Sequence, residues 1–177
     1  MILTGEKVNL RPLRETDLTL TTEMRNNKTL IEAAMMHPYP VTIKLEEEWF
    51  ESVVNSKSNK NLFFAVENIE TNELIGFAGL MNINYINRNC YHAIVLSDKA
   101  NKLPGSGTDT LTLIVKYAFQ SLNLKKVNAE VISENIASLK MHQKCGFEIE
   151  GTLKNQYYAG GHYQDVIIFS IFNNSNA

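Results

Sequence analysis

The chain has 177 residues, of which 44% are hydrophobic and 20% are charged, and its formal net charge is −2 at pH 7. This composition predicts one folded domain around a single core and excludes a disordered chain. Because the neutralisation of phosphate groups needs a surplus of Lys and Arg, nucleic acid is not expected as the main partner.

The sequence contains no apolar run that approaches the ~20 residues of a membrane-spanning helix. Its first residues lack the apolar region of a signal peptide. The two cysteines, Cys90 and Cys145, have neither a metal-binding nor a redox spacing. We therefore expect a cytoplasmic protein in which both thiols are reduced packing residues.

The N-terminal part predicts one strand and two helices. Residues Lys7 to Leu13 alternate as in a strand. Thr16 or Asp17 can cap a helix that ends near Asn26. A break at residues 37–40 carries two prolines, and Thr42 can cap the next helix. Its apolar stripe at helical spacing consists of Leu45, Trp49, Phe50 and Val53.

Acidic residues are concentrated in the first turns of this second helix, at residues 46–48 and at Glu51. One interpretation is compensation of the helix dipole together with solubility. The other is a negative rim that attracts a cationic amine. The sequence leaves both interpretations open.

Further along the chain, six segments have the composition of strands. They are residues 62–68, 74–80, 91–96, 127–132, 147–153 and 166–172. Turn residues separate the first two segments at Glu70 to Asn72 and the last two at Ala159 to Gly161. About six or seven strands with three or four helices predict an α/β domain with a mixed, mostly antiparallel sheet. We expect this domain to span residues 1–172, followed by a polar tail at 173–177.

A glycine-containing loop, Lys102 to Thr108, lies between the apolar strand Ala93 to Leu96 and an amphipathic helix. Two close glycines at such a junction let backbone N–H groups approach an anion, and the helix N-terminus adds its positive end. The loop is not a P-loop, because no Lys follows the glycines, and the third glycine of a dinucleotide fingerprint is replaced by Thr110. A phosphate-bearing ligand is predicted here, although a Gly-x-Gly turn alone is also compatible with no ligand.

The helix after this loop is predicted to begin with Thr108 as its N-cap and to end near Asn123. Its apolar face is formed by Leu111, Ile114, Val115, Ala118 and Leu122. A shorter helix is predicted from about Asn135 to the C′ glycine Gly146.

Two motifs resemble those of the GNAT superfamily of N-acetyltransferases. Lys102-x-x-Gly105-x-Gly107 resembles its Gln/Arg-x-x-Gly-x-Gly/Ala loop, and Asn135-x-x-Ser138, followed by Gly146-Phe147, resembles its next motif. They occur in the order and at about the spacing found in the superfamily. The stretches 8–13, 82–88 and 161–166 resemble the ribosomal-protein and spermidine acetyltransferase branches, so the resemblance covers nearly the whole chain.

The resemblance implies a GNAT-like fold in which acetyl-CoA lies between the central strand and the strand after the long helix. It implies direct attack of an amine on the thioester, with no nucleophilic Cys and no metal. The implied cofactor-binding residues are Ile94, Val95, Leu96, Lys102, Leu103, Gly105, Ser106, Gly107, Thr108, Asn135 and Ser138. Pro104 departs from the motif because it lacks a backbone N–H.

His142 stands where the spermidine branch carries a Tyr that acts as the acid for the departing thiolate. An imidazolium could donate this proton, since histidine titrates near pH 6.5. Contact with the cofactor without a chemical role is the alternative. Tyr91 occupies a position at which that branch often has Glu, so no carboxylate base is evident on the central strand.

The expected function is therefore the acetyl-CoA-dependent N-acetylation of a primary amine, with a polyamine such as spermidine as the acceptor. Protein N-termini and amino sugars are alternative acceptors, and a catalytically silent CoA-binding module is an alternative class of protein. The residues expected to bind the acceptor are Glu47, Glu51, Tyr85 and His92. Neither a membrane nor a nucleic-acid partner is expected, and assembly into a homo-oligomer is left open.

Overall fold

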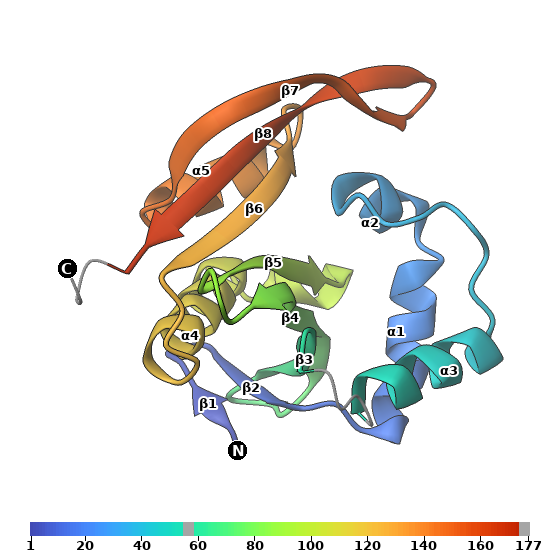
Figure 1. Cartoon of the computed structure of the whole chain (residues 1–177). Coiled ribbons are helices and arrows are strands. Elements are labelled where there is room, and N and C mark those ends of the chain that lie inside the picture. The colour runs from blue at the N-terminus through green and yellow to red at the C-terminus, as the bar shows by residue number, and fades with distance from the viewer. Residues whose placement is uncertain (55–58, 174–177) are drawn as a thin grey trace.

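The computed structural model describes residues 1–54 and 59–173 and contains one eight-stranded sheet with helices on both faces (Figure 1). The strands are β1 (Leu3–Thr4), β2 (Val8–Pro12), β3 (Leu62–Asn68), β4 (Leu74–Asn84), β5 (Asn89–Leu96), β6 (Lys126–Ile132), β7 (Glu148–Ala159) and β8 (His162–Phe172). The α-helices are α1 (Leu18–Arg25), α2 (Lys28–Ala33), α3 (Ile43–Val54), α4 (Ser106–Gln120) and α5 (Ile136–Lys144), and two 3₁₀ turns are η1 (Glu15–Asp17) and η2 (Asp98–Lys102).

The strands follow the order β1-β2-β3-β4-β5-β6-β8-β7, and each described pair is antiparallel except β5 with β6. The parallel pair is short and ends where Tyr91 lies opposite Asn128. Beyond that point β5 continues beside β4 as far as Leu96, while β6 continues beside β8 as far as Ile132. The sheet therefore divides into two halves, and among the described strands backbone pairing joins them only at the beginning of β5 and β6.

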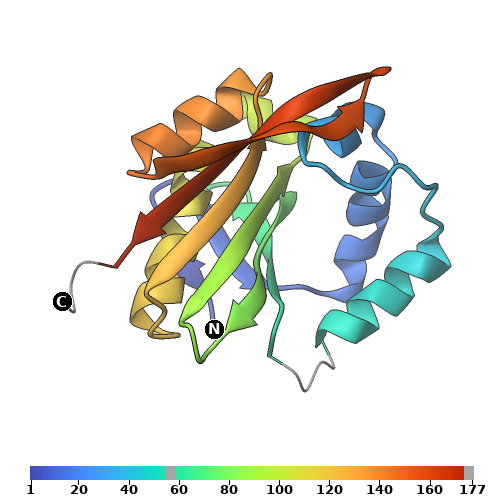
Figure 2. The same ribbon diagram turned by 45° about the horizontal axis from the view of Figure 1, so that its top comes forward.

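Helices α4 and α5 lie on one side of the sheet, and α1 and α3 lie on the other, as both ribbon views show (Figures 1 and 2). The main core forms between α4 and the sheet, where Leu111 and Ile114 are fully buried together with Val127 and Phe169. A smaller cluster on the opposite face contains Met24, Phe77 and Val95. Among the described residues, no helix combines the length and apolar character that crossing a bilayer would require.

The structure confirms the predicted α/β class and the mostly antiparallel sheet, but the expected number of strands was too low. The two-residue strand β1 is too short to give a sequence pattern. Helix α2 was also missed, because it has only six residues and none of them is buried. Its N-cap is Asn27, whose side chain accepts a hydrogen bond from the N–H of Leu30.

Several boundaries differ from those predicted. Helix α4 begins at Ser106, three residues earlier than expected for Thr108 as a cap, because Gly105 takes up the left-handed conformation (φ 89°) that starts the helix. The same helix ends at Gln120, before Asn123. Strand β7 continues past residue 153 to Ala159. Thr42 caps α3 as predicted, since its hydroxyl accepts the N–H of Leu45. Of the predicted tail, residues 174–177 lie outside the described residues.

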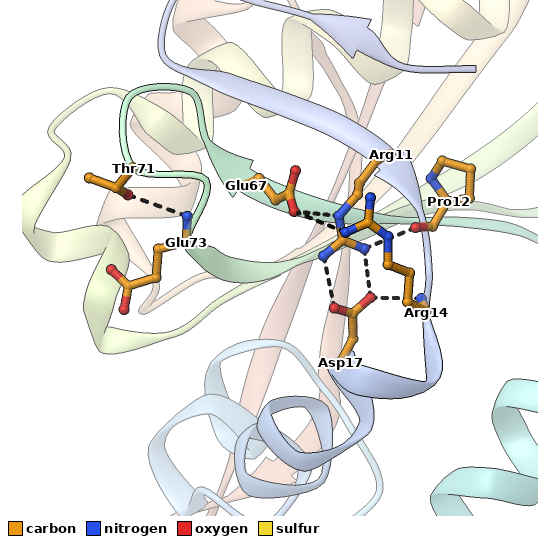
Figure 3. Close-up of polar contacts among 7 residues, drawn as sticks. All are labelled: Arg11, Pro12, Arg14, Asp17, Glu67, Thr71 and Glu73. Carbon is orange, nitrogen blue, oxygen red and sulfur yellow. Dashed lines mark hydrogen bonds and ion pairs between the residues drawn. The ribbon is translucent and has the colours of Figure 1, made fainter.

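A buried ion cluster fixes the start of α1 to strands β2 and β3 (Figure 3). Arg11 donates two hydrogen bonds to Asp17, of 2.7 and 2.8 Å, and its Nε donates to Glu67. Asp17 also accepts the backbone N–H of Arg14 at 2.7 Å. Hydrogen bonding to Asp17 raises the pKa of Arg11 above its usual value, so the guanidinium remains charged although it is only 3% exposed.

Replacement of Arg11 by Met should strongly destabilise the fold, because the buried Asp17 and the half-buried Glu67 would lose the cation that they share. Removal of one partner from a buried ion pair typically costs about 3–5 kcal/mol. Urea unfolding monitored by circular dichroism measures this change. The control is Arg14→Met, since the Arg14 side chain is 62% exposed; equal losses in the two variants would contradict a structural role for the cluster.

Candidate active site

Beyond Tyr91 and Asn128, β5 and β6 separate and leave a gap between them. A side chain bridges the two strands at the closed end of this gap, where their pairing stops. Asn128 donates from Nδ2 to the carbonyl oxygen of Cys90 at 2.9 Å, and its Oδ1 accepts the hydroxyl of Ser170 at 2.8 Å. From His92 to Leu96, the edge of β5 that faces β6 has no partner strand among the described residues. Backbone polar groups on such an edge are available to bind an extended ligand.

The glycine turn lies directly beyond the open end of β5. Gly105 begins helix α4, and the first N–H groups of any helix lack partners within the helix. A side chain at Gly107 would bring its Cβ to 3.0 Å from Met141 Sδ and to 3.7 Å from Leu96 Cδ1. Backbone N–H groups at the start of a 15-residue helix, beside two glycines that lack Cβ atoms, are suited to hold a phosphate group.

Lys7 contacts this turn, although the sequence did not indicate that it would. Its Nζ donates to the carbonyl oxygen of Pro104 at 2.5 Å. A Cβ on Gly105 would lie 3.5 Å from the same nitrogen atom. Pro104 thus removes one N–H donor from the turn but brings an ammonium group to it. Because 97 positions separate the two residues, no local pattern could have indicated this contact.

The other predicted residues of the loop have different environments. Lys102 is exposed at the end of η2, and Leu103 packs against the main core. Ser106 is buried, and its N–H donates to the carbonyl oxygen of Leu103. Thr108 does not cap the helix, and its carbonyl oxygen accepts the hydroxyl of Thr112 at 2.9 Å. The turn therefore offers Gly105, Gly107 and Lys7 to an anion more directly than it offers Lys102.

Asn135 connects α5 to α2. Asn135 is the N-cap of α5, because its Oδ1 accepts a hydrogen bond from the N–H of Ser138. Its Nδ2 donates to the carbonyl oxygen of Ala33 at 3.2 Å. On the other side, the hydroxyl of Tyr157 in β7 donates to the carbonyl oxygen of Ile31 at 3.3 Å. Helix α2 is thereby held next to the motif that was predicted to contact the cofactor.

His142 and His92 form a stacked pair between α5 and β5. Their Nε2 atoms are 2.9 Å apart, and His142 Nδ1 lies 2.7 Å from the carbonyl oxygen of Ser138. Because a carbonyl can only accept, His142 Nδ1 carries the proton and donates it. A neutral His142 then accepts at Nε2 from the Nε2–H of His92. Among the described residues, the Nδ1 of His92 is buried and has no hydrogen-bond partner.

Burial makes both imidazoles weak bases. Desolvation, followed by the proximity of His142, lowers the pKa of His92 to about 3. Desolvation also lowers the pKa of His142, and the hydrogen bond to Ser138 opposes this shift only in part. His142 is 2% exposed and packs against Phe147 and Phe169. The imidazolium form that was expected to protonate the thiolate is therefore disfavoured in this structure.

The four residues expected to bind the acceptor are not brought together. Glu47 and Glu51 are exposed on α3, which packs through Trp49 against β3 and β4. Tyr85 is 49% exposed and lies in the turn before β5, at the end of the strand where β5 is still paired with β6. His92 faces α5 rather than the side of α1. The sequence pattern could not show this, because it does not reveal which helix covers which face.

Comparisons with known proteins agree with this geometry. The acetyltransferase (GNAT) domain model matches residues 7–148. The spermidine N(1)-acetyltransferase of Vibrio cholerae serotype O1 is 29% identical over 162 residues, covering 92% of this chain and 91% of that protein. The spermidine N(1)-acetyltransferase of Escherichia coli K12 is 28% identical over 168 residues, covering 95% and 87%. A crystal structure of the Vibrio cholerae spermidine N-acetyltransferase with CoA and spermine superposes with a TM-score of 0.86 at 28% identity and covers 93% of this chain and 95% of its own.

The buried histidine pair should make the fold sensitive to acid. An unfolded histidine titrates near pH 6.5, whereas the folded-state pKa values are lower, so stability is fully present above that pH and is lost as the pH falls below it. The loss can reach about 1.4 kcal/mol per pH unit for each histidine. Urea unfolding at pH 7 and pH 5 should therefore show a smaller difference for His92→Phe than for the unaltered chain.

The exposed His162 provides the control for this experiment. The hydrogen bond that its Nε2–H donates to the carboxylate of Glu134 raises the pKa of His162, so its contribution to stability is present at low pH and is lost as the pH rises. His162→Gln should consequently retain the full loss of stability at pH 5. If His92→Phe and the unaltered chain lose the same stability between pH 7 and pH 5, the buried pair is not the source of the acid sensitivity.

Proposed function

The chain belongs to the acetyltransferase (GNAT) family, and we propose that it transfers the acetyl group of acetyl-CoA to a primary amine of a polyamine such as spermidine. The observation that carries this proposal is the open edge of β5, which leads from the closed end at Asn128 to the glycine turn at the start of α4. This edge and this turn suit the two chemically different parts of the co-substrate, an amide-bearing arm and a pyrophosphate.

The residues available for acetyl-CoA lie along one continuous path. The N–H groups of the first turn of α4 and the ammonium of Lys7 would hold the phosphates. The unpaired backbone from Ile94 to Leu96 would hydrogen-bond the amide-bearing arm. Met141, which lies against Gly107, and Ser138 on α5 would line the other side of the arm. Acetyl-CoA supplies the activated acyl group, and no covalent enzyme intermediate is needed.

The polyamine acceptor is supported by the relatives named above, two of which are spermidine N(1)-acetyltransferases that align with more than nine-tenths of this chain. The solved Vibrio cholerae enzyme contains CoA and spermine. The net charge of −2 does not oppose the approach of a polycation. Protein N-termini and amino sugars remain the alternative acceptors. We also propose a cytoplasmic location, with which the free thiols of Cys90 and Cys145 agree.

His142 stays the predicted acid for the departing thiolate, with His92 as its partner. Because neutral imidazoles dominate here, the pair would pass a proton along the contact between the two Nε2 atoms instead of storing an imidazolium. Ser138 Oγ, 3.4 Å from His142 Nδ1, lies at the other end of this path. The proposal therefore assigns His142 a proton-transfer role in turnover rather than a role in the binding of acetyl-CoA.

The test of the function is the release of CoA thiol from acetyl-CoA in the presence of spermidine, spermine, an N-terminal peptide or an amino sugar. Acetylation of spermidine or spermine is the expected result. Activity with another amine but not with either polyamine would refute the proposed acceptor and retain the transferase. Binding of acetyl-CoA without transfer to any amine would instead indicate a catalytically silent module.

Acetyl-CoA should stabilise the unaltered chain and should fail to stabilise Gly107→Val. At 100 times its Kd, a ligand that binds only the folded state adds about 2.7 kcal/mol, which corresponds to an increase in Tm of about 5–10 °C for a chain of this length. The control is Gly151→Ala, because a Cβ at that position has no atom within 4 Å. Circular dichroism verifies that both variants are folded; a normal shift for Gly107→Val would place the phosphates elsewhere.

His142→Phe should lower kcat by about 100- to 10,000-fold, the usual contribution of a general acid, and should alter the Kd for acetyl-CoA far less. Phe preserves the ring contacts with Phe147 and Phe169 but removes both nitrogen atoms. His142→Tyr restores a donor and should recover part of the turnover. If His142→Phe has the kcat of the unaltered chain, His142 does not take part in proton transfer.

A further inference from the structure

Glu130 is an exposed carboxylate on β6 that the sequence patterns did not single out. Its two neighbours in the strand, Ala129 and Val131, point into the core below α4. Since side chains alternate along a strand, Glu130 points to the opposite face of the sheet. On the neighbouring strand, the side chain of Val95 occupies that same face and packs against Met24 of α1. Glu130 therefore lies on the side of the sheet that α1 covers.

The register of β5 and β6 gives the level of Glu130 along the gap. The last parallel pair is Tyr91 with Asn128, and two residues further along the strands the positions are Ala93 and Glu130. Two residues of a strand correspond to about 6.6 Å. Glu130 thus lies just beyond the closed end of the gap, where β6 no longer pairs with β5 and keeps β8 on its other edge, with Glu130 opposite Ile168.

The reacting end of acetyl-CoA would come to this level, an argument that rests on the proposed function. Its phosphates belong at the glycine turn, which lies beside Leu96 at the open end of β5. The arm must then run back along β5 towards Tyr91, where Asn128 closes the gap by its bond to Cys90. The thioester at the end of the arm is consequently placed near Ala93, across the gap from Glu130.

Near Ala93, the two faces of the gap between β5 and β6 would then carry different side chains. His92 has the same orientation as Cys90 and faces α5, where it contacts His142. Glu130 faces the opposite side. Among the described residues the side chain of Glu130 forms no hydrogen bond or ion pair, whereas Glu46 is paired with Arg25 and Glu150 with Lys126. Its charge is therefore not neutralised by a cation within residues 1–54 and 59–173.

We propose that Glu130 is the catalytic residue that holds the ammonium group of the acceptor and takes its proton. An alkyl ammonium of pKa about 10.4 is almost fully protonated at pH 7 and has no lone pair with which to attack. Transfer of one proton to the Glu130 carboxylate frees that lone pair. The N–C bond then forms as the C–S bond breaks, the second nitrogen proton passes to the CoA thiolate through His142, and Glu130 returns its proton to water.

The experiment compares Glu130→Gln with the unaltered chain in the acetylation of spermidine between pH 7 and pH 9. Because Glu130 is exposed and Gln has the same shape, the variant should fold normally and should show the same acetyl-CoA thermal shift. Its kcat should fall by about 100- to 10,000-fold at pH 7, as expected for the loss of a general base. The difference in kcat between Glu130→Gln and the unaltered chain should become smaller as the pH rises, because the amine then loses its proton to water.

The matched control is Glu148→Gln, another exposed carboxylate on a strand of the same sheet, which lies on β7 opposite Ser170. Its kcat should remain within twofold of the unaltered chain. If Glu130→Gln is equally active, or only its KM for spermidine rises, Glu130 does not take the proton. An unaltered chain that is not stabilised by acetyl-CoA would instead overturn the proposed function and this inference together, so the thermal shift distinguishes the two failures.

Discussion

The site depends on one constraint, which is that β5 and β6 stop pairing after Tyr91 and Asn128. A sheet normally satisfies the N–H and C=O groups of a central strand on both edges, and unpaired groups are costly when they are buried. Here β6 stays paired with β8 on its other edge from Lys126 to Ile132, and the amide of Asn128 completes the last contact with β5. The open edge of β5 is left in the middle of the sheet rather than at its margin, so a ligand that pairs with it would have protein on both sides.

The division of the sheet also explains the contrast between its two faces. On the side of α5, the histidine pair lies among Phe147 and Phe169, and such surroundings stabilise neutral imidazoles over charged ones. On the side of α1, Glu130 is exposed and retains access to water. A transfer from a thioester to an amine needs a proton acceptor for the ammonium and a proton donor for the thiolate. The alternation of side chains along β5 and β6 would place the two proposed roles, that of Glu130 and that of the histidine pair, on opposite faces of the sheet.

Local patterns allowed much of the fold to be predicted, because the strands and the helices α4 and α5 have clear periodicity or capping residues. The glycine turn was predicted from two close glycines ahead of an amphipathic helix, and the Asn135 motif from the resemblance to the GNAT superfamily; the binding of a cofactor by these residues stays a prediction. Contacts between distant segments could not be predicted. Lys7 reaches the glycine turn from the position before β2, and His92 on β5 reaches His142 on α5. Glu130 was missed because one exposed Glu in an apolar strand is ordinary in sequence, and only the register shows that it lies beside the gap.

Helix α2 shows how the two sides of the site are connected. A six-residue helix without a buried side chain cannot be stable by itself, so its position must be imposed by its neighbours. The carbonyl oxygens of Ile31 and Ala33 are held by Tyr157 of β7 and Asn135 at the start of α5. Asn135 also caps α5, on which His142 lies. Because one side chain serves both helices, a displacement of α5 along the gap would also displace α2 over the face where the acceptor would bind.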